Sequence, residues 1–190
     1  MKYLYVFITL IIFSCSQQNQ NSIQAPEGSQ IPEGASLQNY SSIPGLQKAT
    51  LWEGDVVVGE GDFLNGLYHG SWTTYDNKGK VKQITTYLNG LKQGVELVFD
   101  TQGYVQNKAY YHNDLLEGEF LVFSRRTLSE KRNYSAGALN GKKVRYYTNG
   151  TIMEESNFKS GQIDGVARWY DQEGNLTIEY TYENGERVEN

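Results

Sequence analysis

The sequence predicts an all-β protein, an elongated antiparallel β-meander of tandem hairpin repeats, each about 24 residues long. Three observations support this prediction. An aromatic residue recurs at nearly constant spacing, a glycine stands at almost every expected turn, and Val, Ile, Thr and Tyr are frequent between the turns. Regular glycines and β-branched residues also disfavour helix. With neighbouring strands ~4.8 Å apart, about eleven strands would form a sheet ~50 Å long.

Two series of aromatic residues define the repeat. The first series precedes turns such as Asn-Gly and steps by 24, 24, 23, 24 and 24 residues. Its members, which we call the lead aromatics, are Phe63, Tyr87, Tyr111, Tyr134, Phe158 and Tyr182. The second series stands five residues after a further recurring glycine and consists of Tyr75, Phe99, Phe123, Tyr146 and Tyr170. We expect these rings to build the core, because a one-layer sheet has no second layer to cover it. A stacking groove for sugars or peptides is the alternative.

Each repeat has the pattern of one β-hairpin. A first strand of about six residues ends at the second-series aromatic, and a turn such as Asp76-Asn77-Lys78-Gly79 follows. A second strand of about eight residues leads to the next lead aromatic, after which a pair such as Asn89-Gly90 turns the chain again. The acids Asp76, Asp100 and Asp171 recur at the first turn. We expect them to bind the turn backbone rather than to form a cation ladder.

The third repeat departs from this pattern. Asp114 stands where the other lead turns have glycine, and Thr127 stands where the other repeats have the second turn glycine. This repeat has also lost one residue at that turn, so that Leu128 takes the place of the aliphatic residue that follows. We therefore expect an irregular or strained hairpin here.

Alternation of side chains along the first strand of each repeat assigns residues to the two faces of the sheet. One set is expected to share a face with the second-series aromatics: Thr73, Leu97, Leu121, Val144 and Arg168. The other set is expected to point the opposite way: Trp72 and Thr74, Glu96 and Val98, Phe120 and Val122, Lys143 and Arg145, Ala167 and Trp169.

Residues 1–14 have the features of a lipoprotein signal peptide. The apolar run from Tyr3 to Phe13 is too short to span ~30 Å of hydrocarbon as a helix. The run ends in Ile12-Phe13-Ser14-Cys15, which resembles a bacterial lipobox, and Cys15 is the only cysteine. We expect a lipid anchor on Cys15, and an ordinary cleaved signal peptide is the alternative. Ser16 favours the outer membrane, with the protein periplasmic or surface-exposed in the cell envelope.

Residues 15–48 are expected to form a flexible tether that starts at Cys15. This stretch is polar, contains all three prolines and shows no strand periodicity. Residues 49–62 lack the repeat spacing and are expected to form a capping strand region. The repeat domain then covers residues 63–190, with about five and a half repeats.

The repeat resembles the MORN repeat, over residues 63–185. The segments Tyr87-Leu88-Asn89-Gly90-Leu91-Lys92-Gln93-Gly94 and Phe158-Lys159-Ser160-Gly161-Gln162-Ile163-Asp164-Gly165 show the resemblance best. The 24-residue step is similar to the bacterial variant of this repeat, found in YwqK-type, antitoxin-like proteins. The resemblance implies an all-β meander and a role in protein contacts. Binding of membrane lipids is also attributed to eukaryotic members.

Composition excludes several classes of function. The net charge of -5 argues against a nucleic-acid binder, and the mean hydropathy of -0.58 excludes a polytopic membrane protein. One cysteine and two histidines leave little material for a metal site, and His69 and His112 are expected to be exposed turn residues. Gly59-Glu60-Gly61 lacks the context of a phosphate loop, and no nucleophile motif is present. We therefore expect no enzyme, no cofactor and no metal, and a hydrolase with a site in the third repeat is the least favoured function.

Positive charge concentrates in the third and fourth repeats, at Lys131, Arg132, Lys142, Lys143 and Arg145. One hypothesis is that this cluster contacts an acidic partner or lipid headgroups; the other is a solvated face balanced by neighbouring acids. The function that the sequence favours is a membrane-anchored scaffold for an unidentified protein partner, with a toxin as one candidate in an antitoxin- or immunity-like role. The alternative is an envelope structural protein that binds lipid or glycan through the sheet.

Overall fold

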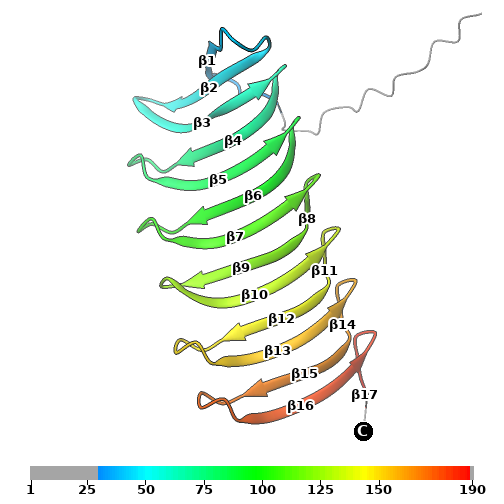
Figure 1. The fold of residues 1–190 in the computed structure, drawn as a ribbon. Helices are drawn as coiled ribbons and strands as arrows, with labels where there is room; N and C mark the ends of the chain where they lie inside the picture. Colours follow the sequence, from blue (N-terminus) through cyan, green and yellow to red (C-terminus); the bar gives the residue numbers. More distant parts are fainter. Residues whose placement is uncertain (1–29, 189–190) are drawn as a thin grey trace, which may run out of the picture.

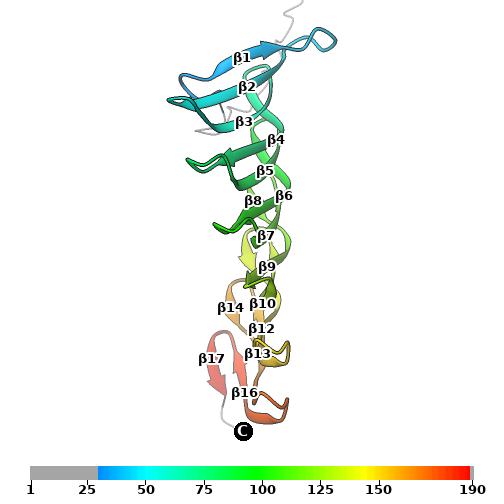
Figure 2. The ribbon, with the colours of Figure 1, turned by 90° about the vertical axis from the view of Figure 1, so that its left-hand side faces the viewer.

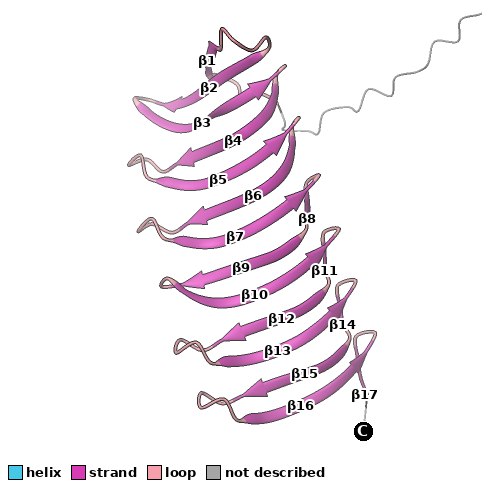
Figure 3. Cartoon of the chain, in the orientation of Figure 1, coloured by secondary structure: helices cyan, strands magenta, loops and turns pink. Residues whose placement is uncertain are grey.

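The structure is a computed structural model, which describes residues 30–188. These residues form one open antiparallel sheet of 17 strands (Figure 1). Long strands that follow one another in the chain pair along the whole length, as in a meander. Three two-residue strands pair with the long strand before them, which also pairs with the next long strand. Figure 2 shows the same sheet from the side, where it is a narrow, twisted single layer. The predicted all-β meander of hairpin repeats is therefore confirmed, and Figure 3 shows strands and turns throughout the described part.

The strands fall into three groups. The N-terminal end consists of β1 (Ser36–Asn39), β2 (Leu46–Glu53) and β3 (Val56–Leu64). The long repeat strands are β4 (Leu67–Tyr75), β5 (Val81–Leu88), β6 (Leu91–Phe99), β7 (Val105–His112), β9 (Gly118–Ser124), β10 (Thr127–Ser135), β12 (Gly141–Tyr146), β13 (Ile152–Lys159), β15 (Gly165–Tyr170) and β16 (Leu176–Glu183). Short strands follow the lead turns at β8 (Leu115–Leu116), β11 (Ala138–Leu139), β14 (Gln162–Ile163) and β17 (Glu186–Val188). Within residues 30–188 there is no helix with the length and apolar character needed to cross a membrane.

The sheet begins earlier in the chain than the sequence predicts. The tether was expected to reach residue 48, yet β1 and the start of β2 lie within it and pair in the register Leu37↔Ala49. Gln30 also bridges Leu67 of β4. All four residues of β1 are exposed, so no apolar alternation marks this edge strand in the sequence. The capping region 49–62 falls in β2 and β3, whereas the expected signal peptide and Cys15 lie outside the described residues.

The lead turns are type I′ turns. Both central residues have positive φ, as in Asn65 (52°) and Gly66 (83°) or Asn89 (51°) and Gly90 (86°). Every lead turn after the first also binds the repeat before it, because the N–H of its second central residue donates to a carbonyl one repeat earlier. These bonds join Gly90 to Tyr68, Asp114 to Lys92, Gly137 to Leu116, Gly161 to Leu139, and Gly185 to Ile163, at 2.8–3.0 Å. This ladder holds successive hairpins in register along one side of the sheet.

The opposite side of the sheet carries the Asp-containing turns. The Asp76 carboxylate accepts the N–H groups of Lys80 (2.9 Å) and Lys78 (2.8 Å), which lowers the pKa of Asp76 below its usual range. Asp100 accepts two turn N–H groups in the same way, and Asp171 accepts that of Asn175. The prediction that these acids bind the turn backbone is confirmed.

The third repeat contains the strained hairpin that the sequence predicts. Asp114 has φ 66°, and Arg125 and Arg126, which form a two-residue turn between β9 and β10, have φ 49° and 71°. Only glycine and asparagine adopt these conformations without appreciable cost, so two arginines there store strain.

Replacement of this turn by Asn-Gly (Arg125→Asn with Arg126→Gly) should raise the free energy of unfolding by about 1 kcal/mol. The gain in stability comes from the relief of strain at both φ angles. It is reduced because the contact of Arg126 with the Tyr104 ring is lost. Urea unfolding measures the change. Arg125→Ala is the matched control, because alanine at φ 49° is as strained as arginine; a gain in the control equal to that of the Asn-Gly variant would contradict the explanation.

The register places the two aromatic series on opposite faces. Thr85 pairs with Glu96 and Glu96 with Ala109, so these residues share one face with the lead aromatics, which we call face A. Leu97 pairs with Ile84 and Lys108, on the face of the second-series aromatics, which we call face B. The predicted alternation along the first strands is confirmed. The two series are therefore separate rows, one on each face.

Most of the fully buried side chains lie on face A. Phe63 has 0% exposure and meets Tyr68 and Trp72 at ring-centroid distances of 4.4 and 5.6 Å. Gly59 and Gly61 make room for Trp72, since a Cβ at Gly59 would lie 2.7 Å from the indole. The ten aromatics of the two series other than Phe63 are half-buried. The core is thus a thin row across the sheet rather than a closed interior.

Candidate functional site

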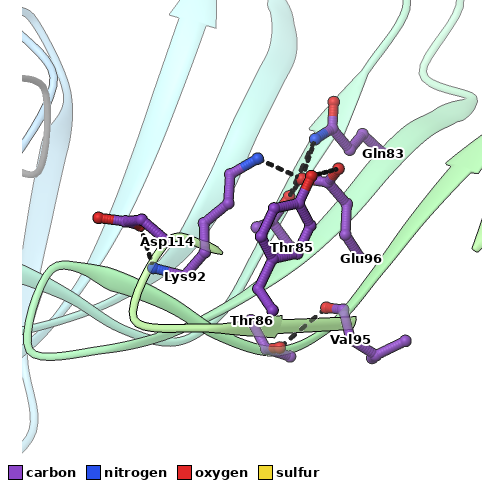
Figure 4. A network of polar contacts seen from close by, with 8 residues as sticks. Gln83, Thr85, Thr86, Lys92, Val95, Glu96 and Asp114 are labelled. Carbon is purple, nitrogen blue, oxygen red and sulfur yellow. Dashed lines mark hydrogen bonds and ion pairs between the residues drawn. The ribbon is translucent and has the colours of Figure 1, made fainter. Parts of the chain in front are cut away.

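A polar network interrupts the apolar row on face A. Glu96, on β6, is only 9% exposed, and its Oε2 accepts from the Nζ of Lys92 at 2.6 Å and from Gln83 Nε2 at 2.9 Å (Figure 4). The hydroxyl of Thr85 donates to the same oxygen at 3.1 Å, and Tyr111 donates to Oε1 at 3.3 Å. Both oxygens of this buried carboxylate are therefore hydrogen-bonded, as a buried charge requires.

The network replaces an apolar contact that the neighbouring repeats make. Opposite each lead aromatic the register places one further series: Tyr68, Lys92, Leu116, Leu139, Ile163 and Arg187. This series was not predicted from the sequence, although it steps by 24, 24, 23, 24 and 24 residues. Lys92 and Arg187 are its charged members, and of these two only Lys92 pairs with an acid among the described residues. Burial raises the pKa of Tyr111 to about 12, with Glu96 adding to the effect, so this phenol stays a proton donor at neutral pH. Because both oxygens of Glu96 already accept hydrogen bonds, the network has a structural role rather than that of a reactive centre.

Face B carries the same three-residue contact near both ends of the sheet. Lys48 lies 2.7 Å from Glu60, which accepts the Tyr75 hydroxyl at 2.7 Å. Near the other end, Glu155 lies 2.8 Å from Lys142 and accepts the hydroxyl of Tyr170 at 2.8 Å. The lysine, and then the tyrosine, holds the pKa of Glu60 below its usual range, and the same pair of causes acts on Glu155.

These two acids predict a pH dependence of stability. A carboxylate whose pKa is lowered on folding stabilises the fold above its unfolded pKa, and this contribution is lost as the pH falls through the folded pKa. Unfolding free energy should therefore drop between about pH 5 and pH 3. The variant Glu60→Gln with Glu155→Gln should be less stable at pH 7 and show a shallower drop. Urea titrations at several pH values measure this, with exposed Glu53→Gln as control; an unchanged slope in the double variant would contradict the assignment.

The predicted basic cluster does not form one patch. The register places Arg132, Lys143 and Arg145 on face A, but Lys131 and Lys142 on face B, because adjacent residues of a strand point to opposite faces. Each cation also has an acid partner: Arg132 Nε lies 2.6 Å and Lys143 Nζ 3.9 Å from Glu130, Arg145 lies 3.2 Å from Glu154, and Lys131 pairs with Glu119. The cluster is thus a set of ion pairs on two faces.

A hollow of about 410 Å³ lies on face B at the second and third repeats. We call it the Tyr104 hollow; it is lined by Leu97, Tyr104, Val105, Lys108, Phe123 and Arg126. The guanidinium of Arg126 lies 4.8 Å from the centre of the Tyr104 ring, and Lys108 Nζ lies 5.0 Å from that of Tyr110. Neither cation forms an ion pair with any acid of residues 30–188.

This hollow was not predicted from the sequence. The available signal was Tyr104 itself, an aromatic residue directly after the turn glycine, where other repeats have Lys80, Thr151 and Asn175. The hollow depends on pairing between repeats, since Phe123 and Arg126 come from the repeat after Tyr104. Spacing within one repeat does not show which side chains of the next repeat lie beside it.

The two histidines lie in different surroundings. His112 is exposed, as expected, and its Nδ1 lies 3.2 Å from Gln93 Nε2. His69 is half-buried in β4 instead, because strand pairing continues beyond the lead turn, and its Nδ1 has no hydrogen-bond partner in the described chain. Among residues 30–188 no three His, Cys, Asp or Glu side chains gather as metal ligands would.

The fold and the open faces define a tandem-hairpin repeat protein. A family model described as the MORN repeat variant matches residues 68–89, 139–160 and 163–184. Each match begins at the residue that pairs with a lead aromatic and ends in the next lead turn, so it covers one hairpin. These segments are similar to MORN repeats, which are generally associated with binding to proteins or membranes. No curated protein matches the chain.

Proposed function

We propose that this protein is a lipid-anchored scaffold of the cell envelope that binds a protein partner through its repeat sheet. One observation supports this most. The sheet is a single layer, so the aliphatic and aromatic row of face B, including Leu97, Leu121 and Phe123, is half-exposed over several repeats. A long row of this kind is suited to a partner that spans several hairpins.

The anchor is tested by metabolic labelling with a fatty acid in the native host. Label is expected on the wild-type chain and not on Cys15→Ala, and the variant should leave the membrane fraction. A wild-type chain without label would contradict the anchor and, with it, the outer-membrane location that Ser16 favours.

The scaffold role is tested by cross-linking the tagged full-length chain in its native host. We expect at least one protein in near-stoichiometric amount. It should be lost from a variant with Leu97→Ser and Leu121→Ser on face B and kept by the control Lys78→Ser, which lies in an exposed turn. Recovery of no cross-linked protein would contradict the scaffold. A toxin among the cross-linked proteins would support the antitoxin- or immunity-like role.

Binding to lipid or glycan is the second candidate. The ion pairs of Lys131, Arg132, Lys142, Lys143 and Arg145 weaken it, because these cations are already neutralised by Glu119, Glu130, Glu154 and Glu155. Sedimentation with vesicles that contain anionic lipid distinguishes the two functions. Binding that is lost on replacement of Lys142, Lys143 and Arg145 would favour the lipid function over the scaffold.

A further inference from the structure

We propose that the Tyr104 hollow binds an acidic, apolar segment of a protein partner. The segment's carboxylates pair with Lys108 and Arg126, and its apolar side chains contact Leu97, Tyr104 and Phe123. This inference rests on the proposed scaffold function and names the chemistry of the partner. It is carried by three observations, which concern charge, shape and backbone conformation.

The first observation is the state of the two cations. The five cations of the predicted basic cluster each pair with a carboxylate, as in Arg132 with Glu130 or Lys142 with Glu155. Lys108 and Arg126 instead lie over tyrosine rings, with no acid of the described chain at ion-pair distance. A ring face binds a cation weakly and leaves its N–H groups free to donate. Carboxylates of a partner could accept charge-assisted hydrogen bonds from the free N–H groups of both cations.

The second observation is that apolar side chains line the hollow between the two cations. Leu97, Val105 and Phe123 line the hollow, and Tyr104 is 40% exposed although its ring is large. A volume of about 410 Å³ suits a few side chains of a peptide rather than a folded domain. The hollow therefore offers apolar contact and two cationic groups to the same short segment.

The third observation is the strained turn that places Arg126. The chain holds Arg125 and Arg126 at φ 49° and 71°, where Asn-Gly would fit without strain. Strain of this kind is often found at binding sites, where it positions a side chain. Here the result is that the Arg126 guanidinium lies over Tyr104, at the edge of the hollow.

The observations favour a peptide over an anionic membrane surface. The whole chain has a net charge of -5, which repels an anionic surface at long range. Lys131, the cation of β10 on face B, adds little to the field of this hollow because it pairs with Glu119. Two cations beside a small hollow match a few acids in one segment better than an extended layer of headgroups.

The test is a selection from a random peptide library displayed on phage, with the purified full-length chain as bait. Enriched sequences should combine Asp or Glu with Phe, Leu or Ile. Their affinity should fall at least about fivefold for the variant Lys108→Gln with Arg126→Gln, as expected for two exposed ion pairs. The control variant Lys82→Gln with Lys159→Gln removes the same charge from exposed positions outside the hollow and should bind as the wild type. Circular dichroism shows whether both variants keep the sheet.

Three outcomes would overturn the inference: no enrichment of acidic sequences, equal loss in both variants, or binding to vesicles with anionic lipid that depends on Lys108 and Arg126. The third would assign the hollow to lipid headgroups. Failure here is distinguishable from failure of the scaffold function. If the cross-linked partner is recovered from the native host equally well with Lys108→Gln and Arg126→Gln, the scaffold stands and the hollow is not its peptide site.

Discussion

Replacement of Phe63 by alanine is expected to lower the free energy of unfolding by about 3–4 kcal/mol. Among residues 30–188, Phe63 is the largest side chain with no exposure, and it contacts Tyr68 and Trp72 in a dense cluster on face A. Its removal leaves a cavity that β2, β3 and β4 cannot close, because their pairing fixes the spacing between them. The N-terminal end of the sheet should therefore unfold first.

Urea unfolding followed by tryptophan fluorescence measures this effect. Trp72 reports on the cluster itself, and Trp169 on β15 reports on the distant end. The matched control is Tyr182→Ala, since Tyr182 holds the same position in the last repeat and is only half-buried. Tyr182→Ala should lower the free energy of unfolding by less than half as much as Phe63→Ala. Equal losses in the two variants would mean that Phe63 does not anchor a local core.

The second large effect is expected at Lys92. The variant Lys92→Leu leaves Glu96 buried without its cation, which should cost about 2–3 kcal/mol. This value lies below that for a fully buried pair because the Lys92 side chain is 30% exposed. Loss of the ammonium also removes the contact of Lys92 with the ring of Tyr111, 4.6 Å from its centre.

The double variant Lys92→Leu with Glu96→Phe should recover most of this loss. It copies Leu116 and Phe120 of the third repeat, so an apolar contact replaces the ion pair. Gln83 keeps a partner, since its amide donates to Thr85 at 3.0 Å. A double-mutant cycle by urea unfolding measures the coupling. Losses that simply add would show that Lys92 and Glu96 act independently, against the network seen in Figure 4.

The sequence was sufficient for the hairpins, their turns and the faces of the first strands. Type I′ turns need positive φ at both central residues, and Asn-Gly pairs such as Asn89-Gly90 predict these turns. Alternation then follows from strand geometry, so Leu97 and Glu96 could be assigned to opposite faces before the register was known. The strained turn at Arg125 could also be located, because one missing residue and one missing glycine coincide there.

What could not be predicted depends on pairing between repeats. The basic residues from Lys131 to Arg145 are close in sequence, but adjacent positions of a strand face opposite ways. Acids of neighbouring strands neutralise most of them, and Glu130 of the same strand neutralises Arg132. The strand β1 has no apolar pattern and exists because β2 offers it an edge. The Tyr104 hollow likewise needs Phe123 and Arg126 of the next repeat beside Tyr104.

The pairing of each strand with its sequence neighbour has a consequence for how the chain folds. Every hairpin closes a loop of fewer than ten residues between its strands, so the entropy lost on each closure is small. A sheet with such low contact order can grow from either end, one hairpin at a time, without waiting for distant segments to meet. We expect it to fold faster than β-sandwiches of similar size, whose partner strands lie far apart in sequence.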